Sequence, residues 1–379
     1  MKSRDAGILL KIFFGIFLFS AIFVASFSTV IAPDAWSHLA NGKELVKKAG
    51  FPDYDGFSYA EKNNWDYATW LFDVFLYSVA YNVGPFNLFI VKFILFSLTL
   101  FVLFLVIFRR QEGKYVSIVL PFCLFGLLLI EPFLNYSPQL FTLLFLSYFL
   151  YVLERMPRKR NKGLYYSLPV ITLLWSNVDV CSIISIFIIL IYLGYRLLET
   201  IEEPAKKEVY DFKLFLIVFL LTLAAVFINP SLHKNSWFFI NEMFSNKWFT
   251  GYSFDFRGIK EMAPLYLYVL ILILVMFYDV KGADVGRHGE FVKDVVLLIV
   301  PGILAAKHVK FIPIFLLISI PIFSYYVYLI FKWDVVWLHK WTEADLLRVK
   351  NPIYVFLLII LVLFSFDRLN KPKGQNYPM

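Results

Sequence analysis

The chain has 379 residues, of which 60% are hydrophobic, 20% aromatic and only 17% charged, and its mean hydropathy is +0.70. Soluble domains are about half apolar and a quarter charged, so this composition excludes an ordinary soluble protein and predicts an all-α, polytopic integral membrane protein. The net charge of +8 lies in short basic clusters between apolar runs. That arrangement is typical of cytoplasmic loops and does not indicate nucleic-acid binding.

Apolar runs recur along the whole chain, which indicates a single integral membrane domain over residues 1–379. The first run is too long for a signal peptide and is interpreted as a retained helix. Several runs fall short of the ~20 residues that a perpendicular span needs, so we expect about eleven transmembrane helices, with nine to thirteen as the range. The expected spans are Gly7–Ile31, Pro85–Phe108, Tyr115–Ile130, Gln139–Leu153, Leu164–Trp175, Cys181–Leu197, Phe212–Ile228, Pro264–Tyr278, Val292–Ala305, Val309–Phe331 and Ile353–Phe366.

One further apolar segment, Tyr67–Tyr81, decides the topology. It is short, rich in aromatic residues and interrupted by Asp73, which favours a helix lying in the membrane interface. With this segment flat, most basic clusters fall on one side of the membrane, and the positive-inside rule makes that side cytoplasmic. We therefore predict a multi-pass protein of the cell membrane with a cytoplasmic N-terminus and a first extracytoplasmic loop over residues 33–84.

That topology puts the unusual polar residues on the extracytoplasmic face. The turns between spans there hold Asn177, Asp179, Asn229, Lys307 and His308, among others. Ionisable groups at membrane depth are costly and are usually kept for function. We therefore expect one active face, formed under the first loop, which itself carries Asp34, His38 and several tryptophans.

The first loop carries three motifs: D-x-W-x-H-L at Asp34–Leu39, P-x-x-D-x-F-S at Pro52–Ser58 and Trp70-Leu71 opening an amphipathic helix. In these motifs the loop resembles that of the polytopic glycosyltransferases of the GT-C superfamily. Later pieces also fit: Pro138-Gln139, Trp175-Ser176-Asn177, Asn229-Pro230 and Lys307-His308-Val309-Lys310-Phe311. The resemblance implies transfer of a sugar from a polyprenyl-phosphate donor to a glycan, lipid or protein acceptor, with a carboxylate of the first loop as base or acceptor anchor.

Asp34 is the candidate catalytic residue, because a carboxylate can take the proton of the attacking hydroxyl. The alternative is that Asp34 only caps the helix that begins at Ala35. His38 follows one helical turn later and shares its face, so it could bind substrate or orient Asp34, or simply be a solvated histidine. The other candidate substrate-binding residues are Trp36, Asp55, Gln139, Asn177, Asp179 and Glu261.

These residues also have structural explanations. Trp36 fits an aromatic belt at the membrane interface. Asn177 and Asp179 are explained equally well by capping and turn formation, and Glu261 by a solvated loop position. Asp53-Tyr54-Asp55 resembles a metal-binding D-x-D, but Asp55-Gly56 is also ordinary turn chemistry. No cofactor or metal site is expected, and a divalent metal stays open at this motif alone.

The leaving phosphate needs positive charge nearby, for which Lys307, His308, Lys310 and Arg257 are the candidates. The alternative is a basic turn that contacts anionic headgroups of membrane lipids. Two other functions stay open for the whole chain: a non-catalytic GT-C-like scaffold subunit, and a flippase or transporter of lipid-linked sugars.

Overall fold

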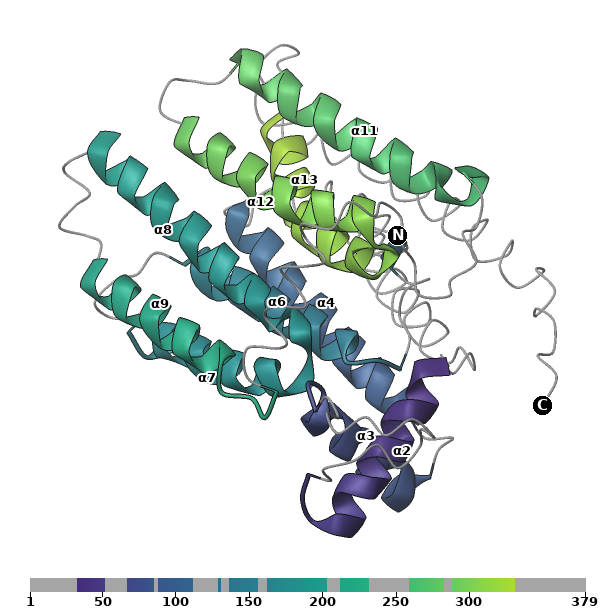
Figure 1. The fold of residues 1–379 in the computed structure, drawn as a ribbon. Helices are drawn as coiled ribbons and strands as arrows, with labels where there is room; N and C mark the ends of the chain where they lie inside the picture. The colour runs from purple at the N-terminus through teal and green to yellow at the C-terminus, as the bar shows by residue number, and fades with distance from the viewer. Residues whose placement is uncertain are drawn as a thin grey trace, which may run out of the picture. The chain divides into compact units, whose positions relative to one another are not determined.

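The computed structural model describes residues 33–51, 67–84, 88–111, 129–130, 136–155, 162–202, 212–231, 259–282 and 288–330. Throughout these ranges the regular structure is helical and no strand occurs, which confirms the predicted all-α class (Figure 1). The longer elements are α2 (Pro33–Lys48), α3 (Trp70–Val83), α4 (Leu88–Arg110), α6 (Gln139–Leu153), α7 (Lys162–Val178), α8 (Ile184–Glu202), α9 (Phe212–Val226), α11 (Ile259–Gly282), α12 (His288–Lys307) and α13 (Ile312–Ile330). Two short 3-10 turns, η4 (Val180–Ile183) and η7 (Val309–Phe311), precede α8 and α13.

Three stretches among the described residues are long and apolar enough to cross a membrane: Leu88–Arg110, Val180–Ile201 and Ile312–Ile330. Three more apolar helices are shorter: Gln139–Leu153, Phe212–Val226 and Pro264–Phe277. The count of about eleven spans therefore stays a prediction, and the expected spans Gly7–Ile31 and Ile353–Phe366 lie outside the described residues, as does nearly all of Tyr115–Ile130. α3 has 14 residues, about 21 Å at 1.5 Å per residue, too short for a hydrocarbon core of about 30 Å.

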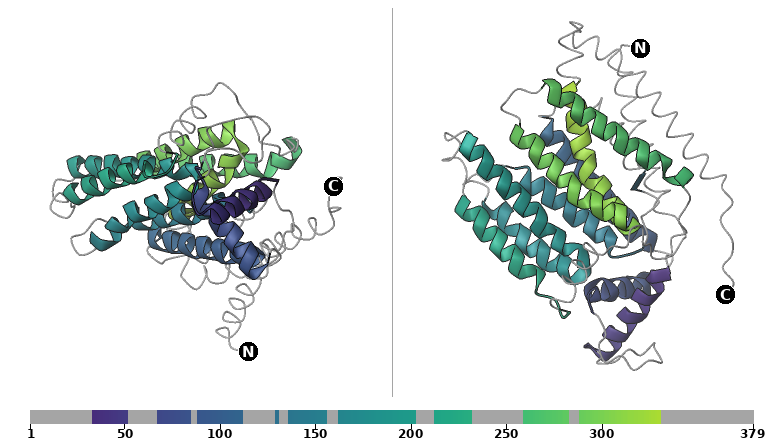
Figure 2. Two further views of the ribbon diagram at one scale, coloured as in Figure 1. Left: turned by 60° about the horizontal axis from the view of Figure 1, so that its bottom comes forward. Right: turned by 45° about the horizontal axis from the view of Figure 1, so that its top comes forward.

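The chain divides into two compact units, which are described separately. The first unit comprises Met1–Val106, Ile130–Phe256 and Val285–Ile318. In it α6, α7, α8 and α9 lie side by side, and α12 contacts α8 (Figure 1). α2 and α3 pack against each other at one end of these helices, as the right view of Figure 2 shows. α3 also contacts α7. We call this pair, residues 33–48 and 70–83, the helical hairpin.

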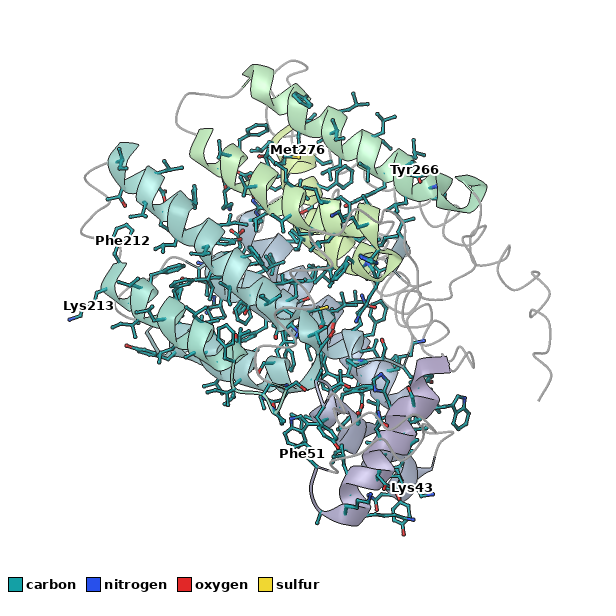
Figure 3. All side chains as sticks on the ribbon, in the orientation of Figure 1. Lys43, Phe51, Phe212, Lys213, Tyr266 and Met276 are labelled. Carbon is teal, nitrogen blue, oxygen red and sulfur yellow. The ribbon has the colours of Figure 1, made fainter. Side chains whose placement is uncertain are left out.

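The two ends of the first unit carry different residues. Lys43 of the hairpin and Phe51, which follows α2, lie at one end, and Lys213, in the first turn of α9, points away from the helices at the other (Figure 3). A buried ionic cluster lies among α6, α8 and α12: Lys293 Nζ is 3.4 Å from Glu154 Oε1, which also accepts a 2.6 Å hydrogen bond from the Tyr192 hydroxyl. These contacts link α8 and α12 to the C-terminal end of α6.

The second unit comprises Ile107–Leu129, Arg257–Asp284 and Ser319–Met379. Its described helices pack through aromatic and polar contacts. The hydroxyls of Tyr268 and Ser319 lie 2.9 Å apart, the Arg110 guanidinium lies 4.9 Å from the centre of the Tyr325 ring, and Gln111 Nε2 donates to the Ser324 carbonyl at 3.2 Å.

Candidate active site

The hairpin owes its close packing to one face of α2. Ala35, Gly42 and Leu45 are buried along this face, whereas Trp36 on another face is 59% exposed. Positions 35, 38, 42 and 45 follow the helical repeat of an amphipathic helix. A Cβ atom at Gly42 would lie 2.0 Å from the Asp73 carbonyl oxygen, so only glycine allows the backbones of α2 and α3 to approach this closely.

A histidine and an aspartate meet across this helix contact. His38 Nδ1 lies 2.6 Å from Asp73 Oδ1, and the Thr69 hydroxyl donates to the same oxygen at 3.3 Å. The two side chains are 15% and 6% exposed. Phe72 holds the imidazole from the side, with its ring edge-on to that of His38 at 5.0 Å between centroids.

Burial raises the pKa of Asp73 above its ordinary value of 3.8, although hydrogen bonding and the charge of His38, with hydrogen bonds from Thr69 and Asn41, act in the opposite direction. An isolated buried carboxylate is expensive. The partners explain how an acidic residue is accommodated in the core of the hairpin.

The side chains of one tryptophan and two asparagines connect the hairpin to the ends of α7 and α9 through hydrogen bonds. Trp70 Nε1 donates to Asn177 Oδ1 at 2.7 Å, and Asn177 Nδ2 donates to the Ile228 carbonyl at 2.8 Å. Asn229 Nδ2 donates to the carbonyls of Ala68, at 3.2 Å, and Ser176, at 2.5 Å. Three segments far apart in the sequence are thereby joined at one point.

Asp179 stabilises the turn between α7 and α8. It is 1% exposed, accepts a 2.6 Å hydrogen bond from the Thr142 hydroxyl and accepts another from the Cys181 amide at 3.3 Å, which caps η4. Trp175 Nε1 donates to Thr142 Oγ1 at 2.8 Å. Asp179 therefore links α6 to η4 as a buried cap, and its predicted role in substrate binding stays a prediction.

The basic turn between α12 and α13 lies against the start of α6. Gln139 Nε2 donates to the backbone carbonyl of Lys310. The Lys310 side chain is exposed, whereas Lys307 is buried and closes the last turn of α12. The His308 ring lies edge-on to Phe311 with 6.0 Å between centroids. The turn therefore offers one accessible ammonium group, that of Lys310, and one buried one.

An open groove of about 670 Å³ runs between the hairpin and the ends of α7 and α9. Its surface is mostly apolar. The lining residues are Trp70, Leu71, Leu173, Leu174, Asn177, Phe227, Ile228, Asn229 and Pro230. The two asparagines that anchor the hairpin are thus the polar groups of an otherwise apolar groove.

Two charged residues, one in the hairpin and one in α4, were not among the predicted site residues. Asp73 was noted only as an interruption of an apolar segment, and Lys92 of α4 is 1% exposed with its ammonium group 5.5 Å from the centre of the Tyr136 ring. Tyr136 belongs to the apolar cluster that also holds Ala35, Phe72 and Leu88. A single charge within an apolar helical run is the sequence signal that points to such residues.

Asp55 and Arg257 lie outside the described residues, and for Asp34 and Glu261 only the backbone is described. α2 is described from Pro33, a favoured residue for a first helical position, so Asp34 lies inside the first turn and not before a helix that begins at Ala35. Glu261 likewise lies in the first turn of α11 and not in a loop. Both boundaries correct the sequence-based expectation.

The described side chains include no group of three or more His, Cys, Asp or Glu residues placed to hold a metal ion. What they do offer is a histidine fixed by a carboxylate, which suits proton transfer, and an exposed cation on the basic turn, which suits an anion.

These features define an all-helical, membrane-associated protein with a polar site where the helical hairpin meets the ends of α6, α7 and α9. No protein-family model matches the chain, and no curated protein is significantly similar to it.

Proposed function

We propose that this protein is a membrane glycosyltransferase of GT-C type that moves a sugar from a polyprenyl-phosphate donor to an acceptor on the extracytoplasmic face of the cell membrane. The observation that carries the proposal is the convergence at the hairpin. Trp70, Asn177 and Asn229 come from three distant segments and are joined by hydrogen bonds of 2.7 to 3.2 Å. These hydrogen bonds support the proposal because they bring together Trp70-Leu71, Trp175-Ser176-Asn177 and Asn229-Pro230, three of the pieces on which the resemblance to GT-C proteins rests.

The proposal assigns the phosphate of the donor to the basic turn and its isoprenoid chain to the apolar groove. Lys310 is the exposed cation of that turn, and a leaving phosphate is stabilised by a nearby positive charge. The groove of about 670 Å³ is lined by aliphatic and aromatic side chains, which suits a hydrocarbon chain. Asp34, in the first turn of α2, is the proposed base or acceptor anchor.

The proposed topology has about eleven spans, with the hairpin lying at the outer surface. The N-terminus and the exposed Lys213 at the far end of the first unit would then face the cytoplasm, in accord with the positive-inside rule.

The first experiment is native mass spectrometry of the full-length protein in detergent. We expect a co-purified polyprenyl-phosphate sugar in the wild type and a loss of at least tenfold in Lys310→Ala. Lys213→Ala is the matched control, because it removes an exposed lysine at the opposite end. Only ordinary phospholipids in the wild type would refute the donor assignment.

The role of Asp34 is tested separately in reconstituted vesicles with the captured polyprenyl-phosphate sugar. A general base contributes a factor of roughly 10² to 10⁴ to a rate. Transfer by Asp34→Asn at the wild-type rate would therefore remove Asp34 from the mechanism.

A further inference from the structure

The pair formed by His38 and Asp73 has an arrangement suited to proton transfer. The carboxylate is more deeply buried than the imidazole, with 6% against 15% of the side chain exposed, and it contacts only one ring nitrogen, Nδ1, at 2.6 Å. No described residue forms a hydrogen bond with the other nitrogen, Nε2. Nδ1 of His38 is thus occupied by Asp73, whereas Nε2 has no hydrogen-bond partner among the described residues.

A carboxylate at Nδ1 determines which tautomer the ring adopts. An ionised carboxylate accepts hydrogen bonds and donates none, so Nδ1 must carry the proton and Nε2 must keep its lone pair. The same hydrogen bond stabilises the imidazolium that forms when Nε2 takes up a proton. Asp73 is itself held by the Thr69 hydroxyl at 3.3 Å, and the helix contact at Gly42 keeps α3 within reach of His38.

We infer that His38 and Asp73 form a proton-accepting pair, in which Asp73 positions His38 and Nε2 of His38 takes the proton from a hydroxyl group of the acceptor. This inference rests on the proposed function and deepens it. His38 follows Asp34 by one turn of α2, so the two residues divide the work, with Asp34 anchoring the acceptor and His38 receiving its proton.

The step balances without another reactant. The acceptor O–H bond breaks and its proton moves to Nε2, while the acceptor oxygen forms a bond to the anomeric carbon. The bond between that carbon and the phosphate oxygen breaks, and its electron pair leaves with the polyprenyl phosphate. The imidazolium, stabilised by Asp73, then releases the proton to water.

The test begins with the tautomer, which a merely structural role would not determine. Full-length protein labelled with ¹⁵N-histidine is measured by NMR in detergent at mildly alkaline pH, and the His38 signals are assigned with His38→Gln. We expect a protonated Nδ1 and an unprotonated Nε2 in the wild type. In Asp73→Asn the amide group donates to Nδ1, so we expect the protonated nitrogen to change to Nε2.

The second measurement is transfer from the polyprenyl-phosphate sugar captured by the wild type. We expect Asp73→Asn and His38→Gln to lower the transfer rate by roughly 10² to 10⁴, the usual contribution of a general base. Glu44→Gln is the matched control: it makes the same carboxylate-to-amide change on α2, where Glu44 pairs with Lys48 at the surface, and should leave the rate unchanged.

Each outcome decides the question. An Nε2-protonated His38 in the wild type overturns the inference whatever the activity. The expected tautomer with undiminished transfer by both variants overturns it while the proposed function stands. If wild-type protein neither binds nor transfers a polyprenyl-phosphate sugar, the proposed function fails and the proton-accepting role fails with it.

Discussion

Gly42→Ala is the most informative single perturbation of the hairpin. The added Cβ would lie 2.0 Å from the Asp73 carbonyl oxygen, 2.6 Å from its carbonyl carbon and 2.8 Å from Tyr77 Cβ. Contacts of Cβ atoms below 3.0 Å are essentially never seen, so α3 must retreat by about 1 Å. The distance between His38 Nδ1 and Asp73 Oδ1 would grow from 2.6 Å to about 3.6 Å, which is no longer a hydrogen bond.

The free-energy cost follows from three terms. Overpacking costs about 1–3 kcal/mol, and the loss of a hydrogen bond to a charged group costs about 1.5–3 kcal/mol. Replacing glycine by alanine inside a helix returns about 1 kcal/mol. We therefore expect the Gly42→Ala variant to lose about 1.5 to 5 kcal/mol of unfolding free energy.

The assay is thermal and denaturant unfolding of the purified protein in detergent, with the ¹⁵N signal of His38 recorded in parallel. Gly194→Ala in α8 is the matched control, because its Cβ meets nothing within 4 Å and the change should be neutral or stabilise by up to about 1 kcal/mol. A Gly42→Ala protein as stable as the wild type, with an unchanged His38 signal, would refute the close approach of α2 and α3.

Three further predictions concern other contacts. Asn229→Ala removes the hydrogen bonds to the carbonyls of Ala68 and Ser176 and should lower the free energy of unfolding by about 1–3 kcal/mol in denaturant titrations; no change would mean that the hairpin is held elsewhere. Glu154→Ala leaves the buried Lys293 ammonium without its closest carboxylate and should cost about 3 kcal/mol, measured in the same way; a stable variant would show that Asp294, at 3.6 Å, suffices. Burial raises the pKa of Asp73 above 3.8, so the folded state binds this proton more tightly than the unfolded state. Its contribution to stability is complete below the unfolded pKa and is lost as pH rises through the folded pKa. The melting temperature of the wild type should therefore fall relative to that of Asp73→Asn as pH rises above the unfolded value of 3.8, and parallel curves would contradict the pKa shift.

The helices themselves were largely predictable from the sequence. The run Gln139–Leu153 was predicted with the same ends as α6, and the runs at α8, α9 and α13 with ends shifted by a few residues. Uninterrupted apolar composition is a local property, and a helix satisfies its backbone hydrogen bonds within the same segment. The helix ends that the sequence predicts less accurately are those with polar residues. The start of α11 at Ile259 was missed because Lys260 and Glu261 look like loop residues in isolation.

Individual residues of the candidate site were predictable from the sequence, but the contacts between them were not. The sequence singled out His38, Asn177 and Asn229 because polar groups in apolar surroundings are costly. It could not give their partners. Trp70 and Asn177 are 107 residues apart, and Asn229 and Ala68 are 161 residues apart, so no local pattern relates them. Asp179 had both a capping and a binding interpretation, and its hydrogen bonds from Thr142 and Cys181 account for it as a cap.

What the sequence alone determined is the class: an apolar, helical chain with polar turns, because hydrophobicity and helix formation are summed over neighbouring residues. Which polar groups meet was decided by the tertiary structure. Gly42 illustrates the reason, since nothing local marks it as different from the other glycines of the chain. Only against the Asp73 backbone does its missing side chain bring a carboxylate within 2.6 Å of His38.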